Sequence, residues 1–362
     1  MRAAVMRANH APLQIEEVHI DAPGPGEVLV RTAASGICHS DLHVVEGALP
    51  MPPPCILGHE PAGIVEAVGA DVVAFAPGDR VIGCISAWCG ACEMCLRGKP
   101  HLCGGTSFQR AADAPPRLSV DGAPVLQFAN LSSFAEQMLT HERSLVKIRE
   151  DMPLDRAALI GCGVTTGVGA ALNTARVEPG STCAVIACGG VGLAALQGCR
   201  IAGASRIVAV DNQPWKLELA RRLGATDVVD ASEGDPVAQV MERTGGGVDY
   251  AFECLGSRAT VQQAVGMLKR AGTAVLVGIV PLGQMVELHI ADVTFQEKRI
   301  LGSLMGSNRF RLDMPRYVDF YLDGRLKLDE MISARIGLAD VNEAFEALRK
   351  GEAARQVIVF DA

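Results

Sequence analysis

Thr182–Gly192 reads T-C-A-V-I-A-C-G-G-V-G, an apolar run followed at once by a glycine-rich turn. The run has the length and composition of a buried strand, and the apolar stretch Val191–Ala202 after the turn has those of a helix. Glycines between a strand and a helix let the backbone approach a pyrophosphate, and the helix N-terminus favours its negative charge. The segment therefore predicts the first strand and helix of a dinucleotide-binding parallel sheet.

The turn departs from the usual G-x-G-x-x-G pattern because Ala187 stands at the first glycine. Without its context, this glycine-rich segment would also fit a tight turn with a purely structural role. Asp211 ends the next predicted strand, 19 residues after Gly192, where a carboxylate can accept hydrogen bonds from an adenosine ribose and repel a 2′-phosphate. This favours NAD over NADP, although Asp211 could instead cap the turn before Pro214. The nucleotide contacts predicted from this unit are Gly189, Gly190, Val191, Gly192 and Asp211.

After this strand–turn–helix segment, predicted strands and helices alternate toward the C-terminus. The chain before it is rich in Gly and Pro and contains short β-like runs. The two patterns predict an α/β protein with an irregular antiparallel barrel and a doubly wound parallel sheet. We expect the barrel domain to comprise residues 1–163 and 301–362, and the nucleotide domain residues 164–300. The last segment, Gln356–Phe360, has the size of a strand that rejoins the barrel.

The bulk composition agrees with two such domains. The 362 residues exceed one ordinary core, and 49% hydrophobic residues with 39 glycines suit strands buried under helices. A net charge of −8, from 41 acids and 33 bases, argues against nucleic acid or an anionic membrane as a partner. The N-terminus lacks a signal-like apolar stretch and no later apolar run was expected to span a bilayer, so we expect a cytoplasmic protein.

Four of the twelve cysteines, Cys89, Cys92, Cys95 and Cys103, fall within fifteen residues. This spacing lets one loop surround a tetrahedral Zn²⁺ with four thiolates, leaving no open position for a substrate. We therefore predict a structural zinc lobe at about residues 84–104. The alternative is a set of unligated cytosolic thiols.

Three further residues are candidates for a second, catalytic zinc: Cys38 in G-I-C-H-S-D, His59 in G-H-E and Cys162 in G-C-G. Catalytic zinc needs three protein ligands and one open position. Taken singly, each cysteine could be a buried apolar filler and the histidine a structural hydrogen-bonding residue. The remaining cysteines are expected to be small buried hydrophobic residues: Cys55, Cys84, Cys183, Cys188, Cys199 and Cys254.

In order along the chain, G-I-C-H-S-D-L-H, G-H-E-P-A-G-I-V, the four-cysteine lobe, G-C-G-V-T-T-G and G-G-V-G resemble motifs of the zinc-containing alcohol dehydrogenases of the medium-chain dehydrogenase/reductase family. The resemblance covers essentially the whole chain. It implies a GroES-like barrel domain, a Rossmann domain, NAD, and one catalytic and one structural zinc per subunit.

The same resemblance implies roles at the catalytic site. Cys38, His59 and Cys162 would hold the zinc, with Asp41 orienting His59 and Glu60 behind the metal. Ser40 would take the alcohol proton and pass it through the cofactor ribose to His43, which could otherwise be a plain surface histidine.

Further positions match cofactor and substrate contacts of the family. Thr166 and Val191 would pack on the nicotinamide, Asp211 and Lys216 would contact the adenosine ribose, and Arg355 the pyrophosphate. Lys216 and Arg355 could instead be solvated surface charges. The apolar residues expected at the substrate pocket, which could also be ordinary core residues, are Leu49, Ile85, Phe108 and Ile279, the last also beside the cofactor.

The expected activity is the reversible, NAD-dependent oxidation of medium or bulky primary alcohols to aldehydes, by hydride transfer from an alkoxide held at the zinc. A formaldehyde dehydrogenase acting on the S-(hydroxymethyl)glutathione adduct is the first alternative. It is disfavoured because the stretches where that branch carries several acids and an arginine read E-G-A-L-P-M-P-P-P and T-S-F-Q here. A zinc-free quinone or enone reductase and a non-catalytic cofactor-binding structural or regulatory protein remain as further alternatives.

Family members pair through the edge strands of their Rossmann sheets. We therefore expect a homodimer or homotetramer, with the strand near Thr273–Val280 as the pairing edge.

Overall fold

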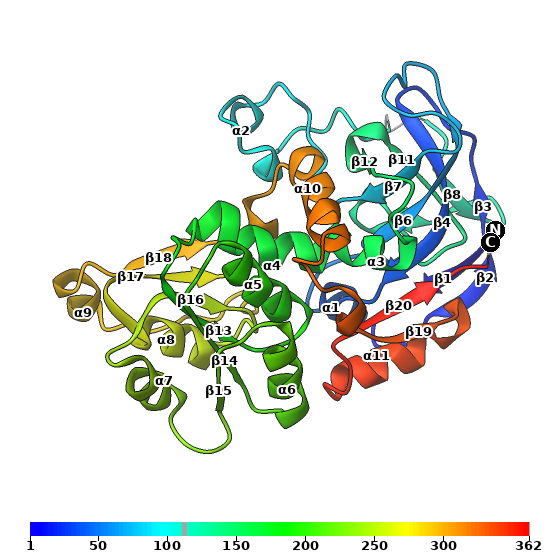
Figure 1. The fold of residues 1–362 in the computed structure, drawn as a ribbon. Coiled ribbons are helices and arrows are strands. Elements are labelled where there is room, and N and C mark those ends of the chain that lie inside the picture. The colour runs from blue at the N-terminus through cyan, green and yellow to red at the C-terminus, as the bar shows by residue number, and fades with distance from the viewer. Residues whose placement is uncertain (111–113, 362) are drawn as a thin grey trace. The chain divides into compact units, whose positions relative to one another are not determined.

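The computed structural model describes residues 1–110 and 114–361. The chain forms two compact units, drawn as a ribbon in Figure 1. Unit 1 contains Met1–Cys162, Arg309–Asp323 and Ile332–Ala362, and unit 2 contains Gly163–Asn308 and Gly324–Met331.

Unit 1 is built on a largely antiparallel sheet in the order β12-β7-β6-β4-β20-β19, with β11 also pairing with β4. Along the central strand β4, every second residue from Val28 to Gly36 is buried and the residues between them are buried or half-buried, as in a strand covered on both faces. The strands of this sheet are β4 (Glu27–Gly36), β6 (Pro61–Val68), β7 (Arg80–Gly83), β11 (Gln137–His141), β12 (Leu145–Lys147), β19 (Ile332–Ile336) and β20 (Arg355–Val359). Strand β20 pairs with β4, which confirms that the C-terminal segment rejoins the first domain.

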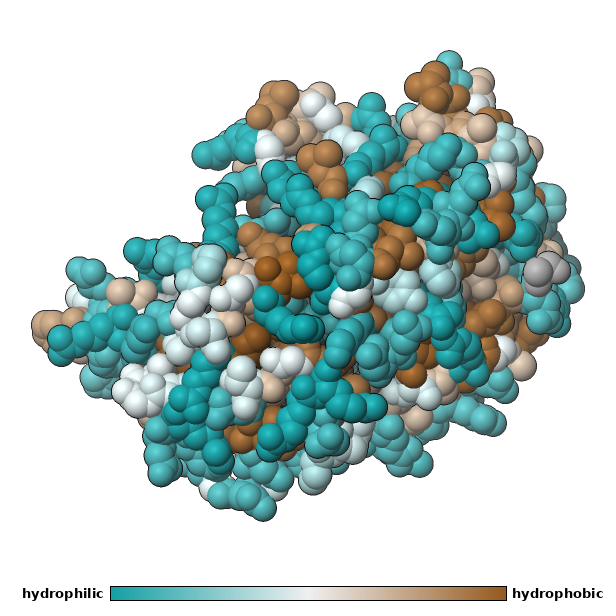
Figure 2. All heavy atoms as spheres, in the orientation of Figure 1, coloured by the Kyte–Doolittle hydropathy of each residue, from teal (hydrophilic) through white to brown (hydrophobic). Residues whose placement is uncertain are grey.

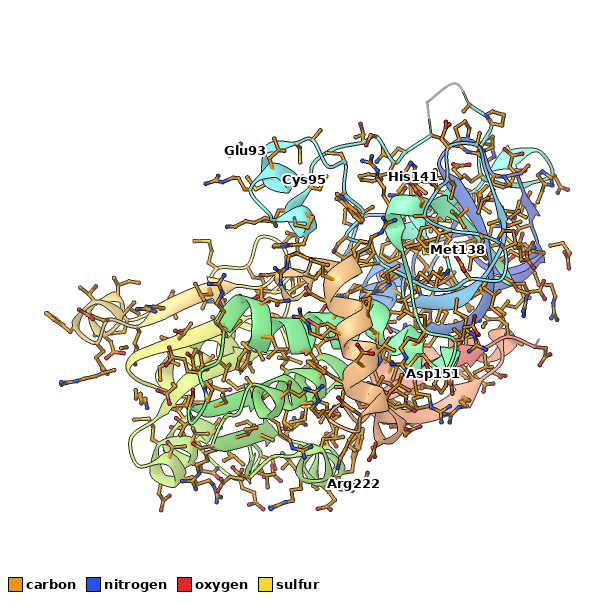
Figure 3. The ribbon with its side chains drawn as sticks, turned by 45° about the horizontal axis from the view of Figure 1, so that its top comes forward. Glu93, Cys95, Met138, His141, Asp151 and Arg222 are labelled. Atoms are coloured by element: carbon orange, nitrogen blue, oxygen red, sulfur yellow. The ribbon has the colours of Figure 1, made fainter. Side chains whose placement is uncertain are left out.

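Two smaller sheets complete unit 1. One has the order β10-β5-β1-β2, from β1 (Arg2–Met6), β2 (Gln14–Glu17), β5 (Cys55–Ile56) and β10 (Leu126–Gln127). The other has the order β3-β8-β9, from β3 (His19–Ile20), β8 (Leu118–Val120) and β9 (Ala123–Pro124). Met138 of β11 lies in the interior with Val30, Val65 and Leu145, which form one core cluster (Figure 3). The helices of this unit are α1 (His39–Val45), α2 (Glu93–Leu96), α3 (Leu154–Leu159), α10 (Phe310–Leu322) and α11 (Val341–Arg349).

Unit 2 is a parallel sheet in the order β15-β14-β13-β16-β17-β18. This is the Rossmann order, in which the first strand, β13, lies in the middle. Its strands are β13 (Thr182–Ile186), β14 (Arg206–Asp211), β15 (Asp227–Asp230), β16 (Val248–Glu253), β17 (Leu268–Leu276) and β18 (Arg299–Gly302). The connecting helices are α4 (Thr165–Gly169), α5 (Gly190–Ile201), α6 (Pro214–Leu223), α7 (Pro236–Thr244), α8 (Arg258–Gly266) and α9 (Ile290–Phe295).

The second domain boundary differs from the sequence-based prediction, which placed it at residue 301. Strand β18 pairs with β17, so the chain stays in unit 2 until Asn308. A later segment, Gly324–Met331, also belongs to unit 2 because the buried Gln197 amide of α5 binds both backbone groups of Lys327, at 2.7 and 3.3 Å. A short strand and one buried glutamine leave little periodic signal, which is why the boundary could not be placed from sequence.

The expected pairing edge is also wrong. Strand β17, which contains most of Thr273–Val280, has neighbours on both sides, β16 and β18. Among the described residues, β15 and β18 end the sheet.

Residues 154–175 form one helical stretch, in which α-helical segments alternate with wider π-helical turns at Ile160–Val164 and Ala170–Ala175. By length and composition this stretch could cross a membrane, contrary to the expectation that no such run exists. However, 83% of its most apolar window is buried within the protein, as in the core helix of a globular fold. On the face shown in Figure 2, hydrophilic side chains predominate and hydrophobic ones lie between them in small groups.

Candidate functional site

The four-cysteine loop folds into a small lobe around α2, where Cys95 lies (Figure 3). Its sulfur atoms converge, and the backbone amides of Ala91 and Cys92 donate to Sγ of Cys89 at 3.4 and 3.2 Å. The amides of Cys89 and Gly105 donate to Sγ of Cys103 at 3.2 and 3.3 Å. Amides that point at sulfur stabilise thiolates rather than thiols.

The geometry of the lobe fits zinc. Sγ of Cys92 lies 3.8 Å from Sγ of Cys103, and the sulfurs of the four cysteines lie within 4.8 Å of one another. A tetrahedron with Zn–S bonds of about 2.3 Å has an edge of about 3.8 Å. Backbone hydrogen bonding, first from Cys95, lowers the pKa of Cys92 to about 6. The four residues would hold a structural ion, as the spacing predicts.

The root of the lobe is fixed by an aromatic and cationic stack. The Arg311 guanidinium lies 4.8 Å from the centre of the Trp88 ring, and Phe310 meets the same ring edge-on at 5.2 Å. Arg143 donates to the carbonyl of Trp88 at 3.3 Å and also to that of Cys89. Trp88 directly precedes Cys89, so this stack connects the lobe to α10. The stack is not among the features predicted from the sequence.

The second cluster brings together Cys38, His59, Glu60 and Cys162, all buried, with possible ligand atoms within 4.8 Å of one another. Cys38 caps α1 after β4, while His59 and Glu60 directly precede β6. Cys162 lies in the first π turn. A Cβ at Gly161 would come within 3.2 Å of the Glu60 backbone, so glycine lets this helix approach the other ligands. Residues separated by more than a hundred positions thus meet at one point.

Charges inside this cluster favour a divalent cation. Nδ1 of His59 lies 3.1 Å from Oδ1 of Asp41, which also accepts from the Gly58 amide at 2.9 Å. Burial alone lowers the pKa of His59, but the negative charges of the Asp41 carboxylate and the Cys38 thiolate raise it to about 10. A hydrogen bond from the Cys162 thiol holds the pKa of Cys38 well below its usual range. Two cysteines and one imidazole suit zinc.

Glu60, a member of this cluster, also forms a buried ion pair with Arg355. Gly36 borders it, and a Cβ there would lie 2.9 Å from the Arg355 guanidinium. Arg355 is only 6% exposed, which excludes a solvated surface charge. Arg355 lies in unit 1, whereas the glycine-rich nucleotide turn lies in unit 2. A contact of Arg355 with a pyrophosphate therefore stays a prediction.

Ser40 and His43 lie on α1, directly after Cys38. They are three residues apart and therefore share one face of the helix. Both are half-buried, as a relay that reaches solvent requires. Their proton transfer role stays a prediction.

The nucleotide turn in unit 2 has the close packing that its glycines imply. A Cβ at Gly192 would lie 1.9 Å from the carbonyl oxygen of Ala187, so no side chain fits there. Ala187 itself has φ of +71°, the left-handed region where the usual motif has glycine. Gly189 caps α5, and the helix begins at Gly190 with Val191 half-buried in its first turn.

Asp211 lies at the carboxyl end of β14, beside this turn. Its Oδ2 accepts from the Cys188 amide at 2.7 Å and its Oδ1 from the Gln213 amide at 3.0 Å. The carboxylate is therefore held at the edge where a ribose would lie. Lys216 follows on α6, half-buried with its ammonium 5.6 Å from the centre of the Trp215 ring. Thr166 of α4 is buried, and its hydroxyl contacts the Met305 sulfur.

A second acid, Glu253, ends the strand on the other side of β13, one residue short of the row of Asp211, and the sequence-based prediction did not include it. Ile186, the last residue of β13, pairs with Val210 on one side and with Glu253 on the other. Glu253 is fully buried and accepts hydrogen bonds from the next loop. The available signal was an acid ending the apolar strand V-D-Y-A-F-E, as Asp211 ends R-I-V-A-V-D.

The predicted substrate-pocket residues have different environments. Leu49 packs against the core of unit 1, Phe108 is buried and Ile85 is 37% exposed. Ile279, after β17 in unit 2, is 54% exposed. Their joint role around a substrate stays a prediction.

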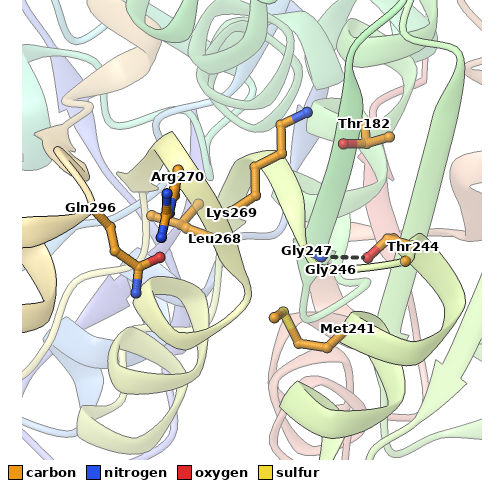
Figure 4. A pocket seen from close by; sticks show the side chains of 10 residues that line it. Thr182, Met241, Thr244, Gly246, Gly247, Leu268, Lys269, Arg270 and Gln296 are labelled. Atoms are coloured by element: carbon orange, nitrogen blue, oxygen red, sulfur yellow. Dashed lines mark hydrogen bonds between the residues drawn. The ribbon is translucent and has the colours of Figure 1, made fainter.

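A pocket of about 520 Å³ lies in unit 2 around Gly245–Gly247, Lys269 and Arg270 (Figure 4). It borders the first residues of β13 and β17, whereas nucleotides bind at the carboxyl ends of such strands. The Gly247 amide in this pocket already donates a hydrogen bond to the Thr244 hydroxyl, at 3.0 Å, and so does not point at a ligand. This pocket is therefore separate from the nucleotide turn.

Comparison with known proteins gives the same assignment. Residues 24–150 match the alcohol dehydrogenase GroES-like domain family, and residues 190–323 match the zinc-binding dehydrogenase family. An alcohol dehydrogenase class-3 of Zea mays is 40% identical over 99% of this chain and 96% of its own length.

Solved structures of two relatives are also similar. The benzyl alcohol dehydrogenase of Acinetobacter calcoaceticus has a TM-score of 0.94 and 34% identity, covering 99% of both chains. A zinc-binding dehydrogenase of Sinorhizobium meliloti 1021 bound to NADP has a TM-score of 0.84 and 31% identity, again covering 99% of both chains. With the two converging ligand clusters and the Rossmann order of unit 2, these similarities show that the chain is an oxidoreductase belonging to the zinc-containing alcohol dehydrogenases of the medium-chain dehydrogenase/reductase family.

Proposed function

We propose that this alcohol dehydrogenase uses NAD and two zinc ions to interconvert medium or bulky primary alcohols and their aldehydes. The observation that carries the proposal is the buried group Cys38, His59 and Cys162, with Asp41 behind the histidine. Three such ligands leave a position open for substrate, while the four-cysteine lobe leaves none.

Zinc, when bound, would polarise the substrate oxygen and lower the pKa of an alcohol, and NAD would accept the hydride. The chain's own residues supply orientation and a proton path. Asp41 holds Nδ1 of His59, so Nε2 faces the cluster, and the Glu60–Arg355 pair balances charge behind it. Ser40 would receive the alcohol proton and His43 would carry it toward solvent.

The preference for NAD is proposed from Asp211. Its buried carboxylate is fixed by two backbone amides, and a 2′-phosphate beside it would meet an uncompensated negative charge. The relative bound to NADP makes this worth testing directly. Asp211→Ser should reduce kcat/KM for NAD at least about tenfold and raise that for NADP. Equal use of both cofactors by the wild-type enzyme would contradict the proposal.

The substrate class is proposed from the apolar character of Leu49, Ile85, Phe108 and Ile279. The similarity to a benzyl alcohol dehydrogenase supports a bulky primary alcohol. The relatives named alcohol dehydrogenase class-3 support a second candidate, the thiol adduct of formaldehyde. The segments that would bind that adduct read E-G-A-L-P-M-P-P-P, with a single acid, and T-S-F-Q, without an arginine, so we rank it second.

One experiment separates these candidates. NADH formation would be followed with aliphatic, benzylic and terpenoid primary alcohols, secondary alcohols, and formaldehyde with and without glutathione. We expect chelator-sensitive oxidation of bulky primary alcohols. Activity with the glutathione adduct alone would establish the second candidate, and no NAD-linked turnover by zinc-replete protein would overturn both.

Two cysteine variants test the assignment of the zinc sites. Cys162→Ser should lose one zinc per chain and nearly all activity while keeping the wild-type unfolding midpoint to within a few degrees. Cys92→Ser should lose the other zinc and lower the midpoint, because the lobe then lacks its ion. Metal analysis showing two zinc ions in both variants would contradict the assignment.

We further propose a homodimer or a dimer of dimers, formed through β18. This strand ends the described sheet, so its outer backbone groups can pair with a second copy. Exposed apolar side chains surround it: Ile290, Phe295, Leu301 and Leu304. Figure 1 shows α9, which carries the first two, beside β17 and β18. Leu301→Lys should give monomers in sedimentation, whereas unchanged oligomers would exclude this edge.

A cytoplasmic location is proposed because none of the cysteines among the described residues forms a disulfide. Such a composition suits a reducing compartment.

A further inference from the structure

Strand β17 contains a bulge near its start, at Lys269–Gly272, with the sequence K-R-A-G. The neighbouring strand β16 has one residue opposite these four, because the register of the two strands shifts between Val248 and Tyr250. Ala271 within the bulge has φ of +59°, a left-handed conformation that is costly for a residue with a Cβ. Bulges redirect side chains, and a strained residue that persists favours a functional reason for this one.

The backbone of the bulge and one of its two cations are fixed. The Ala271 amide donates to the carbonyl oxygen of Gln296 at 2.7 Å. The Lys269 ammonium lies 2.6 Å from Oδ1 of Asp249, whose Oδ2 accepts from the amide and the hydroxyl of Thr182, both at 2.8 Å. The charge of Lys269 is therefore balanced by an acid of the neighbouring strand.

Arg270 is the second cation of the bulge. It is exposed and lines the pocket of about 520 Å³ in unit 2. Within residues 1–110 and 114–361 its guanidinium has no hydrogen bond or ion pair, and none of the described residues lining the pocket is an acid. Figure 4 shows Arg270 and Gln296 on one side of the pocket and Met241 and Thr244 on the other. The N–H donors of Arg270 are therefore available to a ligand.

The other groups of the pocket limit what can bind. The Thr244 hydroxyl donates to the Val240 carbonyl at 2.7 Å and accepts from the Gly247 amide at 3.0 Å, so both groups are already bonded. Met241 and Leu268 add apolar surface. A ligand here thus needs an anionic group for the free guanidinium, while the rest of it can be apolar.

We propose that this pocket binds a small organic anion, whose carboxylate or phosphate group pairs with the Arg270 guanidinium and whose apolar part lies against Met241. A planar guanidinium suits both oxyanions because it can donate two parallel hydrogen bonds. The volume of about 520 Å³ lies in the range of small-molecule sites, so an anion with an organic body fits better than a bare ion.

This site goes beyond the proposed function and does not depend on it. The pocket borders the amino ends of β13 and β17, whereas Asp211 lies at the carboxyl end of the parallel strand β14. Dinucleotides bind at the carboxyl edge of such sheets. An anion in the pocket would therefore not compete with the cofactor.

The test uses two anions with the same apolar body, benzoate and phenyl phosphate, and their uncharged counterpart benzamide. Each would be titrated into zinc-replete wild-type protein and Arg270→Gln, with the Kd measured by calorimetry or ligand-observed NMR. We expect at least one anion to bind the wild type saturably, and Arg270→Gln to raise its Kd at least about tenfold. The response to benzamide should be the same in both proteins. The anion that binds more tightly identifies the preferred oxyanion.

Arg221→Gln is the matched control, because Arg221 is another exposed arginine of unit 2 that does not line the pocket. It should leave the Kd of both anions unchanged. A catalytic zinc could also attract an anion, so the comparison would be repeated in a Cys162→Ser background and with saturating NADH. The binding that depends on Arg270 should persist under both conditions.

The inference is overturned if neither anion binds the wild type, or if Arg270→Gln and Arg221→Gln have equal effects. Loss of the Arg270-dependent binding in the Cys162→Ser background, or its displacement by NADH, would also overturn it. Since Arg270 is exposed, its substitution should leave the unfolding midpoint unchanged, which thermal unfolding would verify.

Discussion

Ala187 is the residue at which this chain departs most clearly from the usual nucleotide turn. Its φ of +71° places an alanine in a region that costs an L-residue with a Cβ about 1–2 kcal/mol. The carbonyl oxygen of Ala187 also lies against Gly192, where no Cβ fits. The shape of this turn therefore requires a strained backbone at Ala187 and a residue without a side chain at Gly192.

Ala187→Gly should therefore stabilise the protein by up to about 1 kcal/mol, because relief of the strain exceeds the entropy that glycine adds to the unfolded chain. Urea unfolding would measure it. Ala184→Gly, at a fully buried position inside β13, is the control and should destabilise by about 1 kcal/mol or more. Equal destabilisation by both substitutions would show that the Ala187 conformation is not strained.

Gly192→Ala tests the other half of the turn. The added Cβ would lie 1.9 Å from a backbone oxygen, which cannot rotate away. We expect a loss of NADH affinity of at least about tenfold, because the turn must open where the pyrophosphate binds. Calorimetry with NADH would measure the loss, and wild-type affinity would refute the close packing.

Among the elements, the zinc lobe has little core of its own. Helix α2 has four residues and none of them is buried. The lobe is fixed instead by its metal ligands and by the stack of Trp88 on Arg311, whose guanidinium also donates to the carbonyls of Leu145 and Glu142 at 3.0 and 2.6 Å. A helix of another segment, α10, thus determines where the lobe begins.

Arg311→Met should loosen the lobe while keeping the length of the side chain. It removes two hydrogen bonds and a cation–π contact, so we expect about 2 kcal/mol less stability and faster proteolysis within residues 89–103. Arg316→Met, at an exposed position of the same helix, is the matched control for charge. Equal proteolysis of both variants would mean that Arg311 does not fix the lobe.

At the scale of the whole molecule, Glu27 is a source of acid sensitivity. It is 2% exposed and accepts hydrogen bonds from Arg110 and Arg117, which connect residues 104–110 and 114–130 to β4. Burial alone would raise the pKa of this carboxyl, but the two arginines outweigh it and lower the pKa from 4.5 to about 2. The ionised form is therefore favoured by folding.

Since the folded pKa lies below the unfolded one, the stabilisation is complete above about pH 4.5 and is lost as the pH falls toward 2. A shift of this size corresponds to about 3 kcal/mol. Glu27→Gln should be less stable than wild type at pH 6 and should lose less stability on acidification. Parallel pH profiles of the two proteins, measured by urea unfolding, would contradict this assignment.

Much of the architecture could be predicted because its signals are local. Apolar runs bounded by turns placed β13 and the strand that ends at Asp211, β14, and the expected helix at Val191–Ala202 is present as α5. The four lobe cysteines could be grouped because all of them lie within one loop. Period, turn chemistry and close ligand spacing are properties of short segments, so the sequence itself contains them.

The remaining features were decided by tertiary structure, because they depend on residues far apart in the chain. Cys38, His59 and Cys162 were ambiguous singly and became a metal cluster only where a π turn meets the start of β6. Three further features gave no periodic pattern in the sequence. They are the burial of Arg355 against Glu60, the attachment of Gly324–Met331 through Gln197, and the position of β18 outside β17. Local sequence determines which elements form, but only their packing determines which side chains lie beside one another.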